Sequence, residues 1–452
     1  MTDDLHPTTG GEQPMSDISD EQPAAPMLAR RDLWTAAAGV AAVSAIASRA
    51  SAQEKESGAA PGQPGGPPLP AVSRSGFPVV GLPVYSEELM NVVNLHEFEA
   101  IAKRRISELA YNYIRAGAGD DLTIKANLAA YGDYWIRRKV MLDVSHVDTS
   151  IDLLGNRQEH PILLGPVGLR RLMHPEGDKL TILAAHKSKA ILIGPRADLV
   201  PEYTQQNLMP RWWGFALGHK TKEDARTWAK KNEDAGASAL CIGLDYPYTG
   251  LRDLPSRDHW QTDWMTRPDF SRGDGMVTFQ AGMIWPYFPN MNWEWFDWVR
   301  GASALPIVAK GITTGEDAKR AVQAGASAIC VSNHGGRTLD GAIPTLHALP
   351  EVVDAVGGKV PVITDGGIRR GGDVMKALAL GATAILIGRP FLWGLAAFGQ
   401  DGVQRVVELL QGELRIALGL SGAGTLKAID RSFIRPAWKA YRPGAASGSA
   451  SR

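Results

Sequence analysis

Three segments of the chain share one pattern of polar and apolar residues. They read NEDAGASALCIGLD, ending at Asp245, AVQAGASAICVSNHGG, ending at Gly336, and ALALGATAILIGRP, ending at Pro390. Each combines the end of a helical stretch, a Gly-Ala turn and a continuous apolar run that stops at polar residues or glycine. Strands that are buried on both faces have such runs, so the pattern predicts parallel strands covered by helices.

The spacing of these segments favours a closed barrel. Matching apolar runs, LPIVAKGI and VPVITDGGI, precede the last two segments, and Gly325 and Gly381 lie 56 residues apart, which corresponds to two β/α units. A doubly wound sheet also satisfies the pattern, but the span from about 140 to 425 suits a (β/α)8 TIM barrel. We therefore expect an α/β fold with one barrel domain over residues 85–440.

The first 84 residues do not carry this pattern. Arg30 and Arg31 precede a mildly apolar run at 33–47 and the small residues Ala50-Ser51-Ala52, which predicts a twin-arginine export signal over 1–52 and a periplasmic or secreted protein. The alternative, a membrane anchor, needs roughly 20 apolar residues. Pro, Gly and Ser dominate the rest, so 53–84 is expected to be a disordered linker, and 441–452 a disordered tail.

Charge and cysteine content narrow the class of protein. Lys+Arg and Asp+Glu both number 48, so no net field favours nucleic acid, and a small molecule is the expected partner. The two cysteines, Cys241 and Cys330, lie in apolar runs and are expected to be packed free thiols rather than a disulfide. No metal site is expected.

The ends of the apolar runs carry the polar residues that could do chemistry. In a barrel the carboxyl ends of the strands meet at one mouth, so these residues are expected to lie together. Two glycine-rich loops, DGGIRRGGD at 365–373 and IGRP at 387–390, follow the last two strands, where backbone N–H groups and a helix N-terminus can bind phosphate. The residues expected at this phosphate site are Asp365, Gly366, Gly367, Arg369, Gly388 and Arg389. The alternative is that the glycines only make tight turns.

His334 is the strongest single candidate for catalysis. It follows Ser332 at a strand end, stands beside two glycines that let a ligand approach the backbone, and precedes Arg337 by three residues. A base next to a guanidinium suits a substrate that has an acidic proton and a carboxylate. Taken alone, a histidine is more often structural.

Several motifs together resemble one enzyme family. They are SNHGGR, LPIVAKG, VPVITDGGIRRGGDVMKALALGA, IGRP, NLHEFEAIAKRRISELAYNYIRAGAGDD at 94–121 and HPEGD at 174–178. Over roughly residues 90–440 the chain resembles the FMN-dependent 2-hydroxy acid oxidases and dehydrogenases, which include glycolate oxidase, lactate oxidase and mandelate dehydrogenase. The resemblance implies FMN as cofactor, oxidation of a 2-hydroxy acid to a 2-oxo acid, and a homo-oligomer. The electron acceptor, which is oxygen, a quinone or a cytochrome, is left open.

The resemblance also implies a role for individual residues. His334 would be the base, with Asp245 orienting it, and Lys310 would face the N1 edge of the flavin. The substrate would contact Tyr113, Arg252 and Arg337, and the flavin would contact Pro166, Val167, Gly168 and Ser332. Each has a simpler alternative: a helix cap for Asp245, solvent for Arg252, packing for Tyr113 and a carboxylate partner for Lys310.

The chain departs from the family pattern on one strand. Where the family has F-Q-L-Y, this chain has WWGFALG, and Gly214 and Ala216 are expected to replace the glutamine and the tyrosine; Gly243 replaces a threonine. The lost side chains predict an emptied wall and a preference for bulky 2-hydroxy acids. Two rival functions remain: a barrel that has lost catalysis and binds a ligand or partner, and an FMN barrel of another reaction class, such as an isomerase.

Residues 253–300 are expected to form a long insertion after the fourth strand. It contains six tryptophans, at 260, 264, 285, 293, 295 and 298. Loops of this length are usually functional or disordered, and tryptophan argues against disorder. The family resemblance implies that this insertion lies over the active site and, as in some members, contacts a membrane surface. The alternative is an aromatic cluster that packs on the barrel or at a subunit interface.

Overall fold

The computed structural model describes residues 85–254, 277–279, 282–284 and 288–437. The expected export signal, linker and tail lie outside these residues. Among the described helices, none combines the length and the apolar character that a membrane crossing requires.

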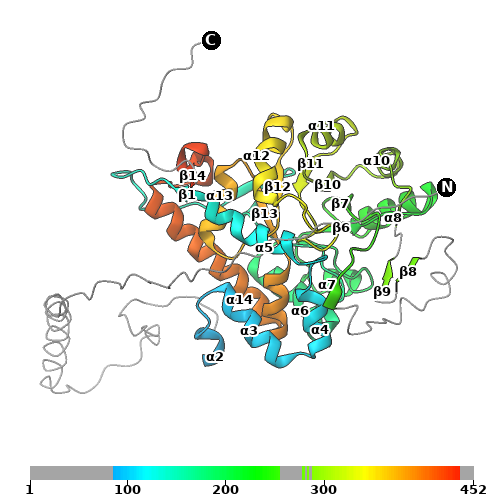
Figure 1. Cartoon of the computed structure of the whole chain (residues 1–452), viewed down its shortest axis with the longest axis horizontal. Coiled ribbons are helices and arrows are strands. Elements are labelled where there is room, and N and C mark those ends of the chain that lie inside the picture. Colours follow the sequence, from blue (N-terminus) through cyan, green and yellow to red (C-terminus); the bar gives the residue numbers. More distant parts are fainter. Residues whose placement is uncertain (1–84, 255–276, 280–281, 285–287, 438–452) are drawn as a thin grey trace, which may run out of the picture. The chain divides into compact units, whose positions relative to one another are not determined.

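Eight parallel strands close into a barrel, as the sequence predicted (Figure 1). In chain order they are β4 (Ile162–Leu164), β5 (Leu192–Ile193), β6 (Trp212–Ala216), β7 (Leu240–Gly243), β10 (Ile307–Ile312), β11 (Ala328–Val331), β12 (Val362–Thr364) and β13 (Ala384–Ile387). Each strand pairs with the next along the chain, and β13 pairs with β4 to close the ring. This sequential order is what repeated β/α units with right-handed crossovers produce.

Helices follow the strands and cover the barrel. They are α6 (Gly177–Ser188), α7 (Val200–Gln205), α8 (Lys222–Asp234), α10 (Glu294–Arg300), α11 (Gly315–Gln323), α12 (Thr345–Val356), α13 (Gly371–Ala379) and α14 (Arg389–Ser421). Threonine hydroxyls cap two of them, because Thr221 accepts from the Asp224 N–H and Thr314 from the Asp317 N–H. The helical geometry of α14 is interrupted at Phe398 and Gly399.

Further elements surround this unit. Before the barrel come α2 (Glu87–Met90), α3 (Leu95–Arg105), α4 (Glu108–Arg115) and α5 (Leu122–Ala129), then three short strands, β1 (Tyr134–Ile136), β2 (Ile151–Leu153) and β3 (Asn156–Gln158). β1 pairs with β14 (Ile434–Pro436) and β2 with β3, both antiparallel. α3 packs against α14. α4 lies close to the barrel mouth, as shown by the hydrogen bonds that Arg337 donates to its backbone carbonyls.

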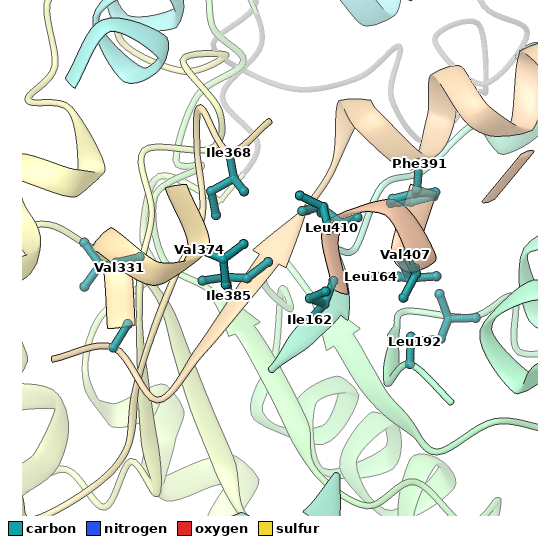
Figure 2. Packing of buried hydrophobic residues seen from close by; sticks show 14 of the residues in the cluster. Ile162, Leu164, Leu192, Val331, Ile368, Val374, Ile385, Phe391, Val407 and Leu410 are labelled. Atoms are coloured by element: carbon teal, nitrogen blue, oxygen red, sulfur yellow. The ribbon is translucent and has the colours of Figure 1, made fainter. Parts of the chain in front are cut away.

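The apolar residues form two clusters that alternate along the strands. One fills the barrel and includes Leu163, Trp213, Cys241, Cys330 and Leu386. The other lies between the strands and the helices, and Figure 2 shows Ile162 and Leu164 of β4 on the side that faces α14. Both cysteines are buried and free, as predicted. Burial raises the pKa of the Cys241 thiol to about 12.

The pleat of β6 corrects the expectation for Gly214 and Ala216. A Cβ on Gly214 would lie 2.6 Å from Asn232 Oδ1 of α8, and Ala216 packs in the outer cluster, so both positions face away from the barrel. Phe215, which pairs with inward-facing Cys241, packs against the inner cluster instead. The side chains at the mouth are therefore Phe215 and Leu217, and the wall is apolar rather than emptied.

The expected insertion is shorter than 253–300. Residues 294–300 form α10, the barrel helix between β7 and β10, and α10 packs against α8. Trp295, Phe296 and Val299 of α10 are buried, which favours packing on the barrel for this part. Between β7 and α10 the described residues include two further strands, β8 (Val277–Phe279) and β9 (Gly282–Ile284), which pair antiparallel. Trp260, Trp264 and Trp285 lie outside the described residues.

Candidate active site

A buried lysine and a carboxylate meet at the ends of three neighbouring strands. Lys310 Nζ donates to Ser332 Oγ at 2.7 Å, Ser332 Oγ donates to Asp365 Oδ2 at 2.7 Å, and Lys310 lies 3.5 Å from the same carboxylate oxygen. Burial by itself lowers the pKa of Lys310, but the carboxylates of Asp365 and Asp245 raise it above its usual value. Lys310 is therefore a fixed cation in the mouth of the barrel.

His334 and Asp245 form a second pair beside this network. His334 Nδ1 lies 3.0 Å from Asp245 Oδ1. Burial works to raise the pKa of Asp245, but the charges of His334 and Lys310 bring it below its usual value, so this carboxylate is an acceptor for Nδ1–H. When Nδ1–H is donated to Asp245, the lone pair of the unprotonated ring lies on Nε2, which forms no hydrogen bond within the described part of the chain.

The backbone that holds this pair needs glycine at particular points. His334, Gly335 and Gly336 all have positive φ, at 57°, 65° and 72°. Such a run is accessible to glycine and costly for a residue such as histidine, which makes the loop a place where backbone strain is held by its surroundings. A Cβ on Gly311, which also has positive φ, would lie 2.7 Å from Asp245 Cβ, so glycine there leaves room for the carboxylate.

Two buried arginines bind the same stretch of backbone. Arg337 donates to the carbonyl oxygens of Tyr113, Ile114 and Ala116 at 3.0, 3.1 and 2.9 Å. Arg389 donates to Ile114 and Ala116 at 2.9 and 3.2 Å. The sequence placed Arg337 with the substrate and Arg389 with the phosphate, whereas the structure brings them side by side.

Burial and the positive charges of neighbouring arginines lower the pKa values of Arg337 and Arg389. Burial, followed by the charge of Arg252, lowers the pKa of Arg337 to about 10. Burial and the charges of Arg337 and Arg369 lower the pKa of Arg389 well below its usual value. Arg252 and Arg337 also lie over the ring of Tyr113, with 5.0 and 5.2 Å from each guanidinium carbon to the ring centroid. A group of buried cations that disfavour one another is a strong site for anions.

One cavity of about 870 Å³ unites almost all the predicted site residues. Its walls contain the predicted residues Tyr113, Pro166, Val167, Gly168, Arg252, Lys310, His334, Arg337, Asp365, Gly366, Gly367, Arg369, Gly388 and Arg389. Asp245 and Ser332 do not line the cavity. Asp245 bonds to His334, and Ser332 bonds to Lys310 and Asp365, and all three of these partners line it. The size suits a ligand as large as a nucleotide together with a small substrate.

Comparison with known proteins shows the family to which the chain belongs. The family described as FMN-dependent dehydrogenase matches residues 102–436. The chain belongs to this family. As an FMN-dependent dehydrogenase it is an enzyme with FMN as its cofactor, and the expectation drawn from the motifs is confirmed.

The matches to known relatives extend over nearly the whole length of each relative. The L-lactate oxidase of a Nostoc strain is 39% identical over 359 residues, covering 76% of this chain and 98% of the relative. Human 2-hydroxyacid oxidase 1 is 36% identical, covering 77% and 97%. The crystal structure of a mandelate oxidase with benzoyl-formic acid matches with a TM-score of 0.67 at 36% identity, covering 75% and 97%.

The residues of this FMN-dependent dehydrogenase fit a phosphate-bearing flavin. Gly388 precedes α14, no side chain caps that helix, and Arg389 begins it, so backbone N–H groups are available to a phosphate. The N-terminus of α13, in contrast, is occupied by Asp373, which accepts from the Arg369 and Arg370 N–H groups at 2.9 Å. A Cβ on Gly168 would meet no atom within 4 Å, which leaves the backbone of this loop open to a flat ring.

Asp365 adds a further point of fit. Its Oδ1 atom is buried and has no hydrogen-bond partner among the described residues. The hydroxyl groups of a ribityl chain are donors of the kind that this acceptor needs. Together with Arg369 and Arg389, Asp365 would hold the chain and phosphate of FMN.

Three features of the site were not predicted from the sequence. Tyr246 packs on the ring of His334, and Phe215 and Leu217 line the wall beside Gly243. Asn127 and Asn333 exchange two hydrogen bonds of 2.9 Å and connect α5 to the loop of His334. Of these, only Tyr246 had a visible signal, because it follows Asp245 directly and stands at the end of a barrel strand.

Proposed function

We propose that this enzyme oxidises a 2-hydroxy acid to the 2-oxo acid, with His334 as the base that removes a substrate proton. The observation that carries the proposal is the His334–Asp245 pair, whose histidine lines the same cavity as Arg252 and Arg337. A 2-hydroxy acid offers a carboxylate to the arginines and an acidic hydrogen to the base. The relatives named as lactate, 2-hydroxyacid and mandelate oxidases support the same class of substrate.

Each residue then has a defined task. Arg252 and Arg337 bind the carboxylate and orient the substrate, and Nε2 of His334 accepts the proton while Asp245 stabilises the imidazolium that forms. Lys310 places a positive charge in the cavity at the carboxyl end of β10, where it would stabilise the negative charge that FMN gains on reduction. Bound FMN would supply the acceptor for the two electrons and the second hydrogen that leave the substrate.

Anaerobic mixing of the purified enzyme with a panel of 2-hydroxy acids tests this function. The expected result is that at least one acid bleaches the flavin absorbance and yields the matching 2-oxo acid. A protein that binds no flavin would favour the ligand-binding alternative. Bound flavin that none of the acids reduces would favour a barrel of another reaction class.

The apolar wall supports a substrate with an apolar side chain. Phe215 and Leu217 line the cavity, and a Cβ on Gly243 would lie 2.8 Å from Leu217 Cδ2, so glycine makes room for the leucine. The proposed preference is for acids larger than glycolate, but the reason differs from the emptied wall that the sequence suggested. The leucine, rather than a void, provides the contact.

The Leu217→Ala substitution is expected to raise the ratio of kcat/KM for a long-chain 2-hydroxy acid to that for lactate by about 10-fold. The physical reason is that three carbons leave the wall, and each buried methylene of the substrate that fills the space contributes about 0.8 kcal/mol. Ala216→Gly is the matched control, because Ala216 faces the outer cluster. A ratio that changes in the control and stays constant in Leu217→Ala would contradict the assigned direction of the two side chains.

The proposed electron acceptor is molecular oxygen, since the relatives quoted above are oxidases. Reoxidation of the reduced enzyme by oxygen, a soluble quinone and cytochrome c, measured separately in a stopped-flow instrument, decides among the three. A quinone or cytochrome rate far above the oxygen rate would contradict the proposal. The homo-oligomer and the membrane contact of the 253–300 segment also stay predictions.

The proposed location is the periplasm or the medium, reached by twin-arginine export. The proposal rests on Arg30 and Arg31, on the apolar run that follows them and on Ala50-Ser51-Ala52. Changing both arginines to lysine is expected to retain the flavin-loaded protein in the cytoplasm, because the pair is read before a folded protein is transported. Cell fractionation with flavin fluorescence measures this, and unchanged export would contradict it.

A further inference from the structure

Tyr246 packs against the proposed base, His334, and lines the same cavity as the two arginines proposed to bind the substrate carboxylate. It follows Asp245 after β7, and its ring centroid lies 4.9 Å from that of His334, with the two planes tilted by 40°. Tyr246 also lines the cavity together with His334, Arg252 and Arg337. The proposed mechanism gives Tyr246 no role.

The surroundings of the phenol keep it protonated. Burial raises the pKa of Tyr246 above its usual value, while the charges of Arg252 and Arg337 act in the opposite direction and Tyr113 and Asp245 add to the increase. At neutral pH the side chain is therefore an O–H donor. These interactions place the phenol in the same electrostatic environment as the two arginines that lie over Tyr113.

The chemistry of this group of side chains points to one kind of atom. Two guanidinium groups and a protonated phenol can all donate hydrogen bonds to one shared acceptor, and the arginines favour a negative charge on it. A carboxylate has two oxygens and about four lone-pair sites, so it can accept from both arginines and from the tyrosine at once. A ring that also packs on the imidazole fixes the distance between the bound carboxylate and the base.

We propose that Tyr246 is a substrate-positioning residue that donates its phenolic hydrogen to the substrate carboxylate and, through its ring, sets the orientation of His334. The inference rests on the proposed function, because it assigns a further contact to the same substrate. It predicts two separable contributions, one from the hydroxyl group and one from the ring. The hydroxyl acts on binding, and the ring acts on the position of the base.

The Tyr246→Phe holoenzyme tests the hydroxyl, because phenylalanine preserves the ring against His334. The probe is oxalate, which presents the carboxylate of the substrate without a hydrogen that can be removed, and its Kd is measured from the change in flavin absorbance. A charge-assisted hydrogen bond that is lost should raise the Kd about 10- to 100-fold. The KM for the best 2-hydroxy acid should rise by a similar factor, while kcat changes by less than about 5-fold.

Tyr248→Phe is the matched control. Tyr248 lies two residues further along the same loop, is 52% exposed and does not line the cavity, so its substitution should leave the Kd and the KM unchanged. FMN content and the melting temperature are measured for both variants. If both quantities equal those of the unaltered enzyme, any weakening of oxalate binding in Tyr246→Phe arises in a folded, flavin-loaded protein.

Two results would overturn the inference. One is a Kd for oxalate in Tyr246→Phe that equals the value of the unaltered enzyme. The other is a fall in kcat with no change in Kd, which would mean that the tyrosine only supports the histidine. Because oxalate binding needs no turnover, the outcome stays separate from the proposed function, which fails only if no 2-hydroxy acid reduces the flavin of the unaltered enzyme.

Discussion

Replacing His334 with alanine is expected to slow reduction of the flavin by substrate by about 10²- to 10⁴-fold, the usual contribution of a general base. The bound FMN should remain, because the residues expected to hold it are those of the glycine loops with Asp365, Arg369 and Arg389, which also line the cavity. Single-turnover reduction under anaerobic conditions measures the rate, and the flavin spectrum measures the occupancy. Asn is a useful second replacement, since asparagine tolerates the positive φ of 57° at this position better than alanine.

The chain provides a matched control for this experiment. His347 forms another histidine–aspartate pair, with 2.8 Å from Nε2 to Asp133 Oδ2, but it does not line the cavity. His347→Ala should therefore reduce the flavin at nearly the rate of the unaltered enzyme. If His334→Ala and His334→Asn retain the full rate with FMN bound, His334 is not the base and the proposed mechanism is wrong.

Replacing Lys310 with methionine is expected to destabilise the folded protein by about 3–5 kcal/mol. The lysine is 3% exposed and lies between two carboxylates, Asp365 at 3.5 Å and the more distant Asp245. Removing one partner of a buried ion pair leaves an uncompensated charge, which is far more costly than the pair is worth in the intact protein. Thermal unfolding followed by circular dichroism on the FMN-free protein measures the loss of stability.

The same substitution should also affect the flavin. Lys310 lines the cavity, so its loss removes a buried positive charge at the end of β10 and should lower the reduction potential of bound FMN, because the electron-rich form is stabilised less. Lys319→Met, on the exposed face of α11, is the control and should change neither quantity. A Lys310→Met protein with unaltered stability and potential would contradict the role given to this cation.

The strand-end residues show how much of the site the sequence contains. Lys310, Ser332, His334 and Asp365 each follow a continuous apolar run, and in a closed parallel barrel the carboxyl ends of all runs converge. Their common location therefore follows from local pattern and topology alone. The family motifs then added FMN and the class of enzyme, and both are confirmed by the family match.

The strand WWGFALG shows where such reasoning reached its limit. All its residues are apolar or glycine, so no alternation marks which ones face inward, and a shift of one residue reverses every side chain. Pairing of Gly214, Phe215 and Ala216 with Leu240, Cys241 and Ile242 fixes the direction. This pairing joins residues about 26 positions apart, so the sequence of β6 alone does not reveal it.

The helix α10 was missed for a related reason. Its N-terminal position is Trp293, which provides no side-chain cap, and three tryptophans within six residues resemble a surface cluster more than an amphipathic helix. Burial of Trp295, Phe296 and Val299 against the barrel is what identifies it. The sequence contained the apolar residues but no signal for where the loop ends.

The sequence by itself determined the barrel, the glycine loops at its strand ends and the family, and it singled out His334 as the candidate base, because each depends on residues that are close together in the chain or on a repeated local pattern. Only the tertiary structure decided the direction of Phe215 and Leu217, the shared carbonyl acceptors of Arg337 and Arg389, and the packing of Tyr246 on His334. Those features join segments up to 275 residues apart, as in the bond from Arg389 to Ile114. The physical reason is that side-chain direction and charge proximity are set by how distant strands and helices pack, which no local pattern records.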